Sequence, residues 1–379
     1  MLSNLQQAGI TRMRLCVSGH ESVDWRPGVL GEFASAGYLI GTYDSYHSVH
    51  PENLKENETW ATAQMTDQLY NEATMTRADG THYMGFRGVG RKLNPVAGKA
   101  FAEERMTANL TGAPYNYYFL DCDATGELHD DYSPAHPLSR EEDAAARKGR
   151  LNRVAQKFDT VISSEGGHAP FASSIHVAEG VFAPYFGWDS PEMKDPESPY
   201  YRGRYYPPGA PDVFFKPPPL QDRYKKSFYA PEFRIPLHTA VFHDSLVVTN
   251  HWNNATYKYP EVQSIMALNE ILYLAPPLIH LNLAEWEKRK DAIVEHYEIW
   301  APLHAKFGFQ PLTDFRYLTD NHLVQQTRFG DDCTIIVNFS NTDYRLESGA
   351  LLPALSAWVN APRLWNEPRI YTPKSPAQK

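Results

Sequence analysis

Short apolar segments alternate with helical segments along most of the 379-residue chain, and this order restricts the possible folds more than any other feature. A strand, a helix and a second strand in that order predict a parallel pair joined by a crossover helix. The predicted strands are Met13–Val17, Tyr38–Tyr46 and the segments HYMGF, YNYYFLD, DTVISSE, HVAEGVF, LHTAVFH and PLIHLN. About eight strands alternating with helices predict an α/β fold, a (β/α)8 TIM barrel. An open doubly wound sheet is the alternative, but no glycine-rich phosphate loop follows the first strand.

Two regions break this alternation. Residues 184–231 are rich in Pro, Tyr and Phe and have no periodicity, which is typical of a functional lid or a disordered insert. After residue 308, the segments HLVQQTRF and CTIIVNFS flank a GDD turn and predict a β-hairpin. We therefore predict a catalytic barrel over residues 1–308 that contains the insert. A small antiparallel, β-sandwich-like domain over 309–360 and a polar tail over 361–379 would follow it.

Composition and charge exclude several classes of partner. The net charge is −9 without a basic cluster, which disfavours nucleic acid and anionic membranes. No run approaches the roughly 20 apolar residues that span a bilayer. Three widely spaced cysteines form no metal or disulfide framework. The N-terminus lacks the layout of a signal peptide, which leaves the location open, and the chain could lack an upstream segment.

The segment YNYYFLDCDATGEL ends a strongly apolar strand in two acids, Asp121 and Asp123. In a barrel, the carboxyl ends of the strands form the active face. Because side chains alternate along a strand, Asp121 and Asp123 are expected to share one orientation, with Leu120 and Cys122 facing the helices. Glu165 ends the next strand, so the two acids are expected about 5–6 Å apart, as in a retaining glycosidase. The alternative is that Asp121 caps a turn and Glu165 forms a salt bridge.

Three motifs, YFLDCDA, VISSEGGH and AVFHDSLVVTNHW, resemble the catalytic barrel of glycoside hydrolase families 101 and 129, the endo- and exo-acting α-N-acetylgalactosaminidases. In these families an Asp ends the fourth strand as the nucleophile and a Glu ends the fifth as the acid/base. The resemblance implies these roles for Asp121 and Glu165, and our count of strands places them on the same two strands. The resemblance implies a retaining glycoside hydrolase that cleaves α-linked sugars and needs no cofactor. Among these sugars, it implies α-N-acetylgalactosaminides as the main substrates.

The resemblance also has departures. Asp123 stands where the family often has a Trp, and the segment between the two acids is longer here. The large β-sandwich that usually precedes the barrel does not appear in the sequence.

The proposed roles also predict how the two acids are protonated. An acid/base role for Glu165 requires a proton near neutral pH, so its pKa is expected to be raised by the Asp121 charge and by burial, while Asp121 stays ionised.

Other residues are expected to line the same cleft. Asp44 matches a family position at which an acid holds sugar hydroxyls, and Asp244, after LHTAVFH, is expected to do likewise. Asp123 and His168 are further candidates for substrate binding. Trp252 is a candidate stacking platform for a sugar ring, with core packing as the alternative.

Two other functions remain open from the sequence. An Asp-x-Asp pair after an apolar strand also holds the divalent ion of a nucleotide sugar in glycosyltransferases. A carbohydrate-binding barrel without turnover is the other possibility. The motif HSVH, with His47 and His50, is a weak metal signal on a loop, so we predict no metal and no cofactor. The predicted partner is a carbohydrate or glycoconjugate, not nucleic acid or a membrane.

Overall fold

The computed structural model describes residues 1–17, 28–55, 59–60, 62–188, 190–205 and 212–374. The chain divides into two compact units. We call Thr11–Glu179 with Tyr205–Ala210 the N-terminal unit. The C-terminal unit consists of Met1–Ile10, Gly180–Arg204 and Pro211–Lys379. The boundary predicted at residue 308 therefore falls inside the C-terminal unit.

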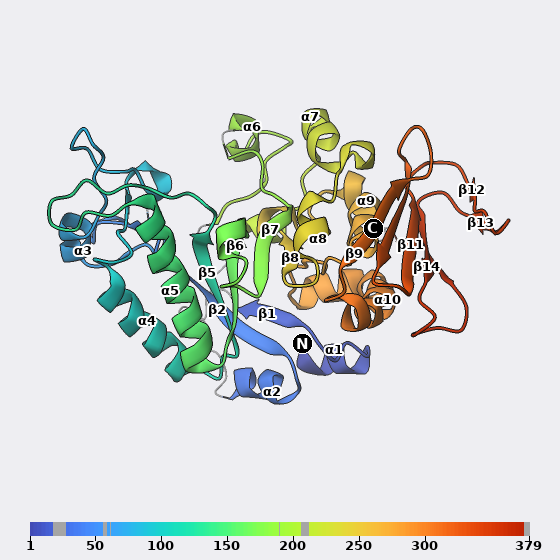
Figure 1. Cartoon of the computed structure of the whole chain (residues 1–379), viewed down its shortest axis with the longest axis horizontal. Helices are drawn as coiled ribbons and strands as arrows, with labels where there is room; N and C mark the ends of the chain where they lie inside the picture. The colour runs from blue at the N-terminus through green and yellow to red at the C-terminus, as the bar shows by residue number, and fades with distance from the viewer. Residues whose placement is uncertain (18–27, 56–58, 61, 189, 206–211, 375–379) are drawn as a thin grey trace. The chain divides into compact units, whose positions relative to one another are not determined.

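An open, curled parallel sheet forms the centre of the N-terminal unit (Figure 1). Its strands follow the order β1-β2-β5-β6-β7, and each neighbouring pair is parallel. The strands are β1 (Arg14–Val17), β2 (Leu39–Ser45), β5 (Tyr117–Ala124), β6 (Val161–Gly166) and β7 (Val177–Ala183). The crossover helices are α2 (Val29–Ser35), α4 (Lys99–Gly112) and α5 (Arg140–Phe158). Shorter elements are β3 (Ser48–Val49), α3 (Asp67–Glu72), η1 (Phe86–Gly88), β4 (Arg91–Lys92) and η2 (Ala169–Phe171).

Local sequence explains the best-defined elements of this unit. Helix α5 begins with the predicted capping box, in which Ser139 and Glu142 each accept a hydrogen bond from the other's backbone amide. Its residues Leu151 and Val154 are buried, in agreement with the predicted helical face. On β2, a Cβ added to Gly41 would lie 1.8 Å from the carbonyl oxygen of Tyr117. Glycine at this position therefore permits the close contact between β2 and β5.

The C-terminal unit contains an antiparallel sheet, as predicted. Its order is β15-β14-β11-β10-β9, and the predicted hairpin is β10 with β11. The strands are β9 (Leu312–Tyr317), β10 (Val324–Phe329), β11 (Cys333–Asn338), β14 (Ser356–Asn360) and β15 (Arg369–Tyr371), with a separate ribbon of β12 (Tyr344–Arg345) and β13 (Leu351–Leu352). The main helices are α1 (Leu2–Gln7), α8 (Leu237–Phe242), α9 (Gln263–Leu272) and α10 (Leu283–Phe307). Residues 180–183 of β7 also belong here, and β8 (Val247–Asn250) is the next strand of their sheet.

The α/β class is confirmed, but the parallel sheet has six strands among the described residues rather than eight. HYMGF leads into the 3₁₀ turn η1, LHTAVFH forms helix α8, and PLIHLN has no regular structure. Helix α8 starts directly after Pro236, whose fixed φ suits the start of a helix. Asp121 and Glu165 therefore lie on the third and fourth strands of the observed sheet order, not on the fourth and fifth.

The predicted tail is partly ordered in the C-terminal unit. Strand β15 lies within residues 361–379, and Tyr371 is buried there. Its hydroxyl lies 2.8 Å from Nδ1 of His296 on α10.

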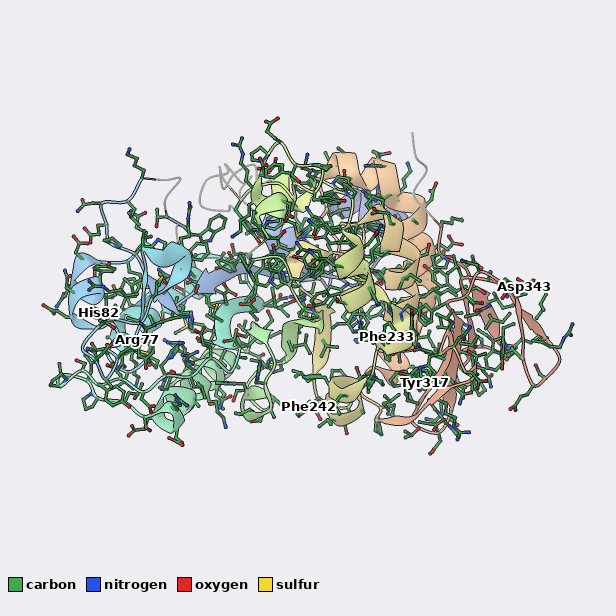
Figure 2. The ribbon with its side chains drawn as sticks, turned by 90° about the horizontal axis from the view of Figure 1, so that it is seen from above. Arg77, His82, Phe233, Phe242, Tyr317 and Asp343 are labelled. Atoms are coloured by element: carbon green, nitrogen blue, oxygen red, sulfur yellow. The ribbon has the colours of Figure 1, made fainter. Side chains whose placement is uncertain are left out.

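The antiparallel sheet also contacts the segment before α8. Figure 2 shows Phe233 next to Tyr317, where the Tyr317 hydroxyl donates a 2.9 Å hydrogen bond to the Arg234 carbonyl. Among the described residues, none of the helices combines the length and the apolar character needed to cross a membrane.

The Pro/Tyr-rich insert shares a hydrophobic core with later residues of the C-terminal unit, among them Tyr259 and Met266. It contains α6 (Pro191–Lys194), η3 (Asp212–Phe214), α7 (Asp222–Tyr224) and the π-helix η4 (Lys225–Tyr229). Phe186 stacks on Tyr224 and Phe228, with ring centroids 4.6 Å apart in each pair. The buried Nζ of Lys258 donates to the carbonyls of Arg202 (2.8 Å) and Lys216 (2.7 Å). The aromatic side chains are thus largely used in packing, and the role of the insert as a lid stays a prediction.

Candidate active site

One face of the parallel sheet in the N-terminal unit, which we call the acid face, is lined by polar side chains. The Tyr117 hydroxyl of β5 lies 2.6 Å from Oγ of Ser163 on β6 and 3.2 Å from Oε1 of Glu179 on β7. Arg14 of β1 donates from Nη2 to Oε2 of Glu179 at 3.2 Å. These contacts connect four strands below the point where the two acids emerge, and they fix the relative positions of those strands.

Asp121 and Glu165 lie at the carboxyl ends of β5 and β6. The parallel register pairs Leu120 with Ser164, which places the two acids side by side. A carboxylate oxygen of Asp121, one of Glu165 and the sulfur of Cys122 all lie within 4.8 Å of one another. The Tyr43 hydroxyl of β2 donates a 2.9 Å hydrogen bond to Oδ2 of Asp121. The predicted adjacency of the acids is therefore present.

The electrostatic coupling of these acids is strong. Burial raises the pKa of Asp121 well above its ordinary value, and the negative charge of Glu165 raises it further. The hydrogen bond from Tyr43 acts in the opposite direction. Two carboxylates this close do not both ionise at low energetic cost, so each one favours the protonated form of the other. The structure thus shows a raised pKa for Asp121, which the sequence led us to expect in its ionised form. The raised pKa expected for Glu165 stays a prediction.

Cys122 breaks the alternation of side chains along β5. Its φ is +63°, and the β5–β6 register shifts between Leu120 and Ala124. The thiol donates a 3.3 Å hydrogen bond to Oε2 of Glu165. Cys122 therefore lies beside the acids, and its predicted orientation toward the helices is wrong. Burial raises the pKa of this thiol well above its ordinary value, so Cys122 contacts Glu165 as a neutral donor.

Asp123, after this kink, faces helix α5. Arg150 donates from Nε to Oδ2 (2.8 Å) and from Nη2 to Oδ1 (2.5 Å) of Asp123, which is 1% exposed. The prediction that Asp121 and Asp123 share one orientation is wrong, because the positive φ of Cys122 reverses the direction of the next side chain. The Asp-x-Asp motif therefore does not present two carboxylates to one ion.

Asp44 is also held on the helix-facing side of the sheet. Its carboxylate accepts hydrogen bonds from Tyr118 (2.7 Å), from Asn109 of α4 (3.0 Å) and from Nε of Arg105 of α4 (3.2 Å). Asp44 is 1% exposed, so its acceptor sites are used by the protein. The adjacent Tyr43, which the sequence analysis did not select, lies on the acid face instead. Alternation along β2 was the signal that could have identified it.

The remaining predicted residues lie in different places. His168 follows β6 and is exposed; its amide donates to the Ala124 carbonyl (3.3 Å), so the loops after β5 and β6 meet. Asp244 is exposed in the turn before β8, and the prediction that it ends a strand is wrong because the preceding segment is helix α8. Trp252 follows β8 in the C-terminal unit, half-buried, with its ring centroid 3.7 Å from that of His251. Substrate binding by these residues stays a prediction.

Comparison with known proteins identifies the family of this chain. A model described as glycosyl hydrolases related to the GH101 family, GH129, matches residues 4–328. The chain belongs to glycosyl hydrolase family 129. No curated protein sequence matches it. The resemblance inferred from the three motifs is thereby confirmed, and the chain is a member of a family of glycoside hydrolases.

Solved structures with this fold are remote in sequence. The α-N-acetylgalactosaminidase NagBb of Bifidobacterium bifidum, in its GalNAc complex, is 17% identical with a TM-score of 0.59, and the match covers 93% of this chain and 51% of that one. Its ligand-free form is 18% identical, with a TM-score of 0.58 and coverage of 92% and 51%. The type III pullulan hydrolase of Thermococcus kodakarensis is 13% identical, with a TM-score of 0.50 and coverage of 95% and 70%. This family 129 chain thus spans about half the length of the NagBb structures.

The two histidines of HSVH in this family 129 member have separate partners. His50 is buried, with Nδ1 2.8 Å from Oγ1 of Thr59 and Nε2 donating to the Phe86 carbonyl at 3.1 Å. His47 instead hydrogen-bonds with Lys92 of β4, which donates to Oε2 of Glu127 at 2.8 Å. Sequence analysis missed Lys92 and Glu127, because three distant segments supply this cluster.

One group of side chains could hold a metal ion. Within the described ranges, Asp121, Cys122 and Glu165 are the three His, Cys, Asp or Glu side chains whose ligand atoms converge within 4.8 Å. Metal ligands must be deprotonated, and burial raises the pKa of both Asp121 and Cys122, so an ion bound here would have to displace these protons.

Proposed function

We propose that this chain is a retaining glycoside hydrolase that cleaves α-linked sugars, with α-N-acetylgalactosaminides as the first substrates to test. The approach of Asp121 and Glu165 to within 4.8 Å carries the proposal. Retaining enzymes hold their two carboxyl groups about 5–5.5 Å apart, whereas inverting enzymes need about 6.5–9.5 Å to admit a water molecule. Membership of family 129 and the fold shared with NagBb support the choice of sugar.

The reaction would proceed by two displacements. Asp121 attacks the anomeric carbon while Glu165 donates its proton to the departing glycosidic oxygen, which leaves a glycosyl ester on Asp121. Glu165, now ionised, removes a proton from water, which attacks the same carbon and releases Asp121. The hydrogen bond from Tyr43 favours ionised Asp121, so it favours the proton on Glu165 when the substrate is bound.

Azide rescue distinguishes the roles of the two acids. We expect Glu165→Ala to lose activity on substrates with poor leaving groups but to react with activated aryl α-glycosides, and azide should then give the α-glycosyl azide. With Asp121→Ala, azide should give the β-glycosyl azide, because it replaces the nucleophile in the first displacement. The reverse pattern would exchange the two roles, and full activity in both variants would exclude this mechanism.

The glycosyltransferase hypothesis has less support. It requires Asp121 and Asp123 to share a divalent ion, but Asp123 is bound by Arg150 on the opposite side of the strand. Hydrolysis of an aryl α-glycoside that survives treatment with a chelator, without a nucleotide sugar, would exclude it. Complete loss of that hydrolysis with the chelator would show that turnover needs a metal ion, which the double displacement does not.

A further inference from the structure

A charged cluster lies in the loops that follow β2 and β5 in the N-terminal unit and has no role in the chemistry described above. Lys92 of β4 donates to Oε2 of Glu127 at 2.8 Å, and it also hydrogen-bonds with His47. Oε1 of Glu127 lies 3.4 Å from Nε2 of His129. The Lys92 side chain is 11% exposed, whereas that of Glu127 is 50% exposed. A buried ammonium group therefore fixes a carboxylate that faces solvent.

The backbone connects this carboxylate to the end of β5. Thr125 donates from Oγ1 to the Cys122 carbonyl at 3.0 Å and accepts from the Glu127 amide at 3.4 Å. The positive charge of Lys92 is close enough to favour the ionised form of the Cys122 thiol. A Cβ on Gly126 would lie 2.6 Å from the His168 ring, which shows how closely the neighbouring loop approaches. Glu127 thus belongs to the same strand ends as the acids.

The order of the strands indicates which part of a glycoside would meet Glu127. Glu165 is on β6, on one side of β5, and would protonate the leaving group. The partners of Glu127 come from the other side of β5: His47 follows β2, and Lys92 belongs to the β3–β4 ribbon. The carboxylate is therefore on the side away from the acid/base, where the sugar that becomes attached to Asp121 would lie.

We propose that Glu127 binds hydroxyl groups of the sugar that is transferred to Asp121, and that Lys92 positions it. An ionised carboxylate accepts strong, charge-assisted hydrogen bonds from hydroxyl donors. Contacts with His129, His47 and Lys92 hold the pKa of Glu127 well below its ordinary range, so it stays an acceptor at all working pH values. The inference rests on the proposed glycosidase function, because it names the substrate group that the same site would bind.

The test compares Glu127→Gln with the wild-type enzyme on an aryl α-glycoside and on its monodeoxy analogues. We expect kcat/KM for the parent substrate to fall roughly 10- to 100-fold, as for loss of a hydrogen bond to a charged group. The analogue that lacks the bound hydroxyl should be a poor substrate for the wild type, and the variant should lose little further on it. Unchanged kcat/KM, or an equal loss on every analogue, would overturn the inference.

Two controls separate the possible failures. Glu141→Gln changes an exposed glutamate at the start of α5 and should leave kinetics and Tm at wild-type values. If Glu127→Gln lowers Tm, Glu127→Asp keeps the charge on a shorter side chain and should restore Tm while KM stays raised. If the wild type hydrolyses no glycoside, the proposed function fails. Calorimetric titration with free N-acetylgalactosamine then tests the inference alone. The inference fails if the wild type and Glu127→Gln bind this sugar with equal affinity.

Discussion

The two faces of the parallel sheet use the same chemical group in opposite ways. On the helix-facing side, Asp44 and Asp123 are each 1% exposed and are paired with arginines from α4 and α5. On the acid face, ligand atoms of Asp121 and Glu165 lie within 4.8 Å of each other, and Asp121 has a raised pKa. The first pair neutralises its charge within the fold. The second pair brings two carboxyl groups together, and perturbed acids of this kind are typical of sites that bind a proton or a substrate.

This difference shows that an acid at the end of a strand is not by itself a candidate for catalysis. Asp121 and Asp123 are separated by one residue, yet the positive φ of Cys122 directs them to opposite faces. Which face a carboxylate occupies, and whether it is fully buried against a cation, decides its role. The comparison can be tested by substitutions on both faces, whose effects on activity and on stability should differ.

The largest effect is expected for the nucleophile. Asp121→Ala should reduce kcat/KM on an aryl α-glycoside by about 10^4-fold or more, a loss typical for removal of a group that acts covalently. Tm should not fall, because burial beside Glu165 makes the ionised carboxylate of Asp121 costly to the folded state. Kinetic assays together with calorimetry check both parts. A large drop in Tm would show that Asp121 has the same structural role as Asp123.

The opposite pattern is expected on the helix-facing side. Asp123→Asn leaves the guanidinium of Arg150 buried without its counter-charge, which typically costs about 3–5 kcal/mol of unfolding free energy. Asp44→Asn should act in the same direction through Arg105. Urea unfolding measures the loss, and kcat/KM per folded molecule should stay near wild type. Normal stability with reduced kcat/KM would return Asp44 to the sugar-binding role that the sequence suggested.

A smaller effect concerns stability and pH. Because burial and Glu165 raise the folded-state pKa of Asp121, the folded state holds this proton more tightly than the unfolded state. That contribution is fully present below the unfolded pKa of about 3.9 and is lost as pH rises through the folded pKa. Asp121→Asn should therefore have a higher Tm than wild type at pH 7, with the gap closing toward pH 4. A gap that does not depend on pH would contradict the coupling.

The smallest effect is expected for Tyr43→Phe. Loss of the hydrogen bond to Asp121 removes about 0.5–1.5 kcal/mol of stabilisation from the anion, which corresponds to a reduction in kcat/KM of roughly 2- to 13-fold. The acidic limb of the pH–rate profile should move to higher pH, because the hydrogen bond lowers the pKa of Asp121. Thr42→Val, on the same strand, serves as the control for packing alone. An unmoved acidic limb would mean that Tyr43 does not act on Asp121.

Much of the sheet could be predicted from the sequence. The segments that became β1, β2, β5, β6 and β7 are short apolar runs, and burial on both faces makes such runs recognisable. The proximity of Asp121 and Glu165 followed from parallel register alone. Helix α8 was mistaken for a strand because LHTAVFH is apolar and short, and periodicity does not separate a short buried helix from a strand.

The environment of the acids could not be predicted in the same way. The assignment of Asp123 to the cleft assumed regular alternation, and a single residue in the left-handed region of backbone space cancels it. The partners of Asp44 come from helix α4, far along the chain, so the local sequence of β2 gave no sign that an arginine would occupy its carboxylate. Burial of charge depends on such distant partners, which is why the sequence did not predict the environment of the helix-facing acids.

The backbone of Cys122 also bears on how this protein could be improved by directed evolution. A φ of +63° costs a residue with a Cβ about 1–2 kcal/mol, and glycine or asparagine adopts it more easily. A library at this position selected for heat resistance should therefore enrich glycine or asparagine. Selection for turnover should retain side chains that reach Glu165. If the two selections enrich different residues, stability and activity favour different side chains at the position of Cys122.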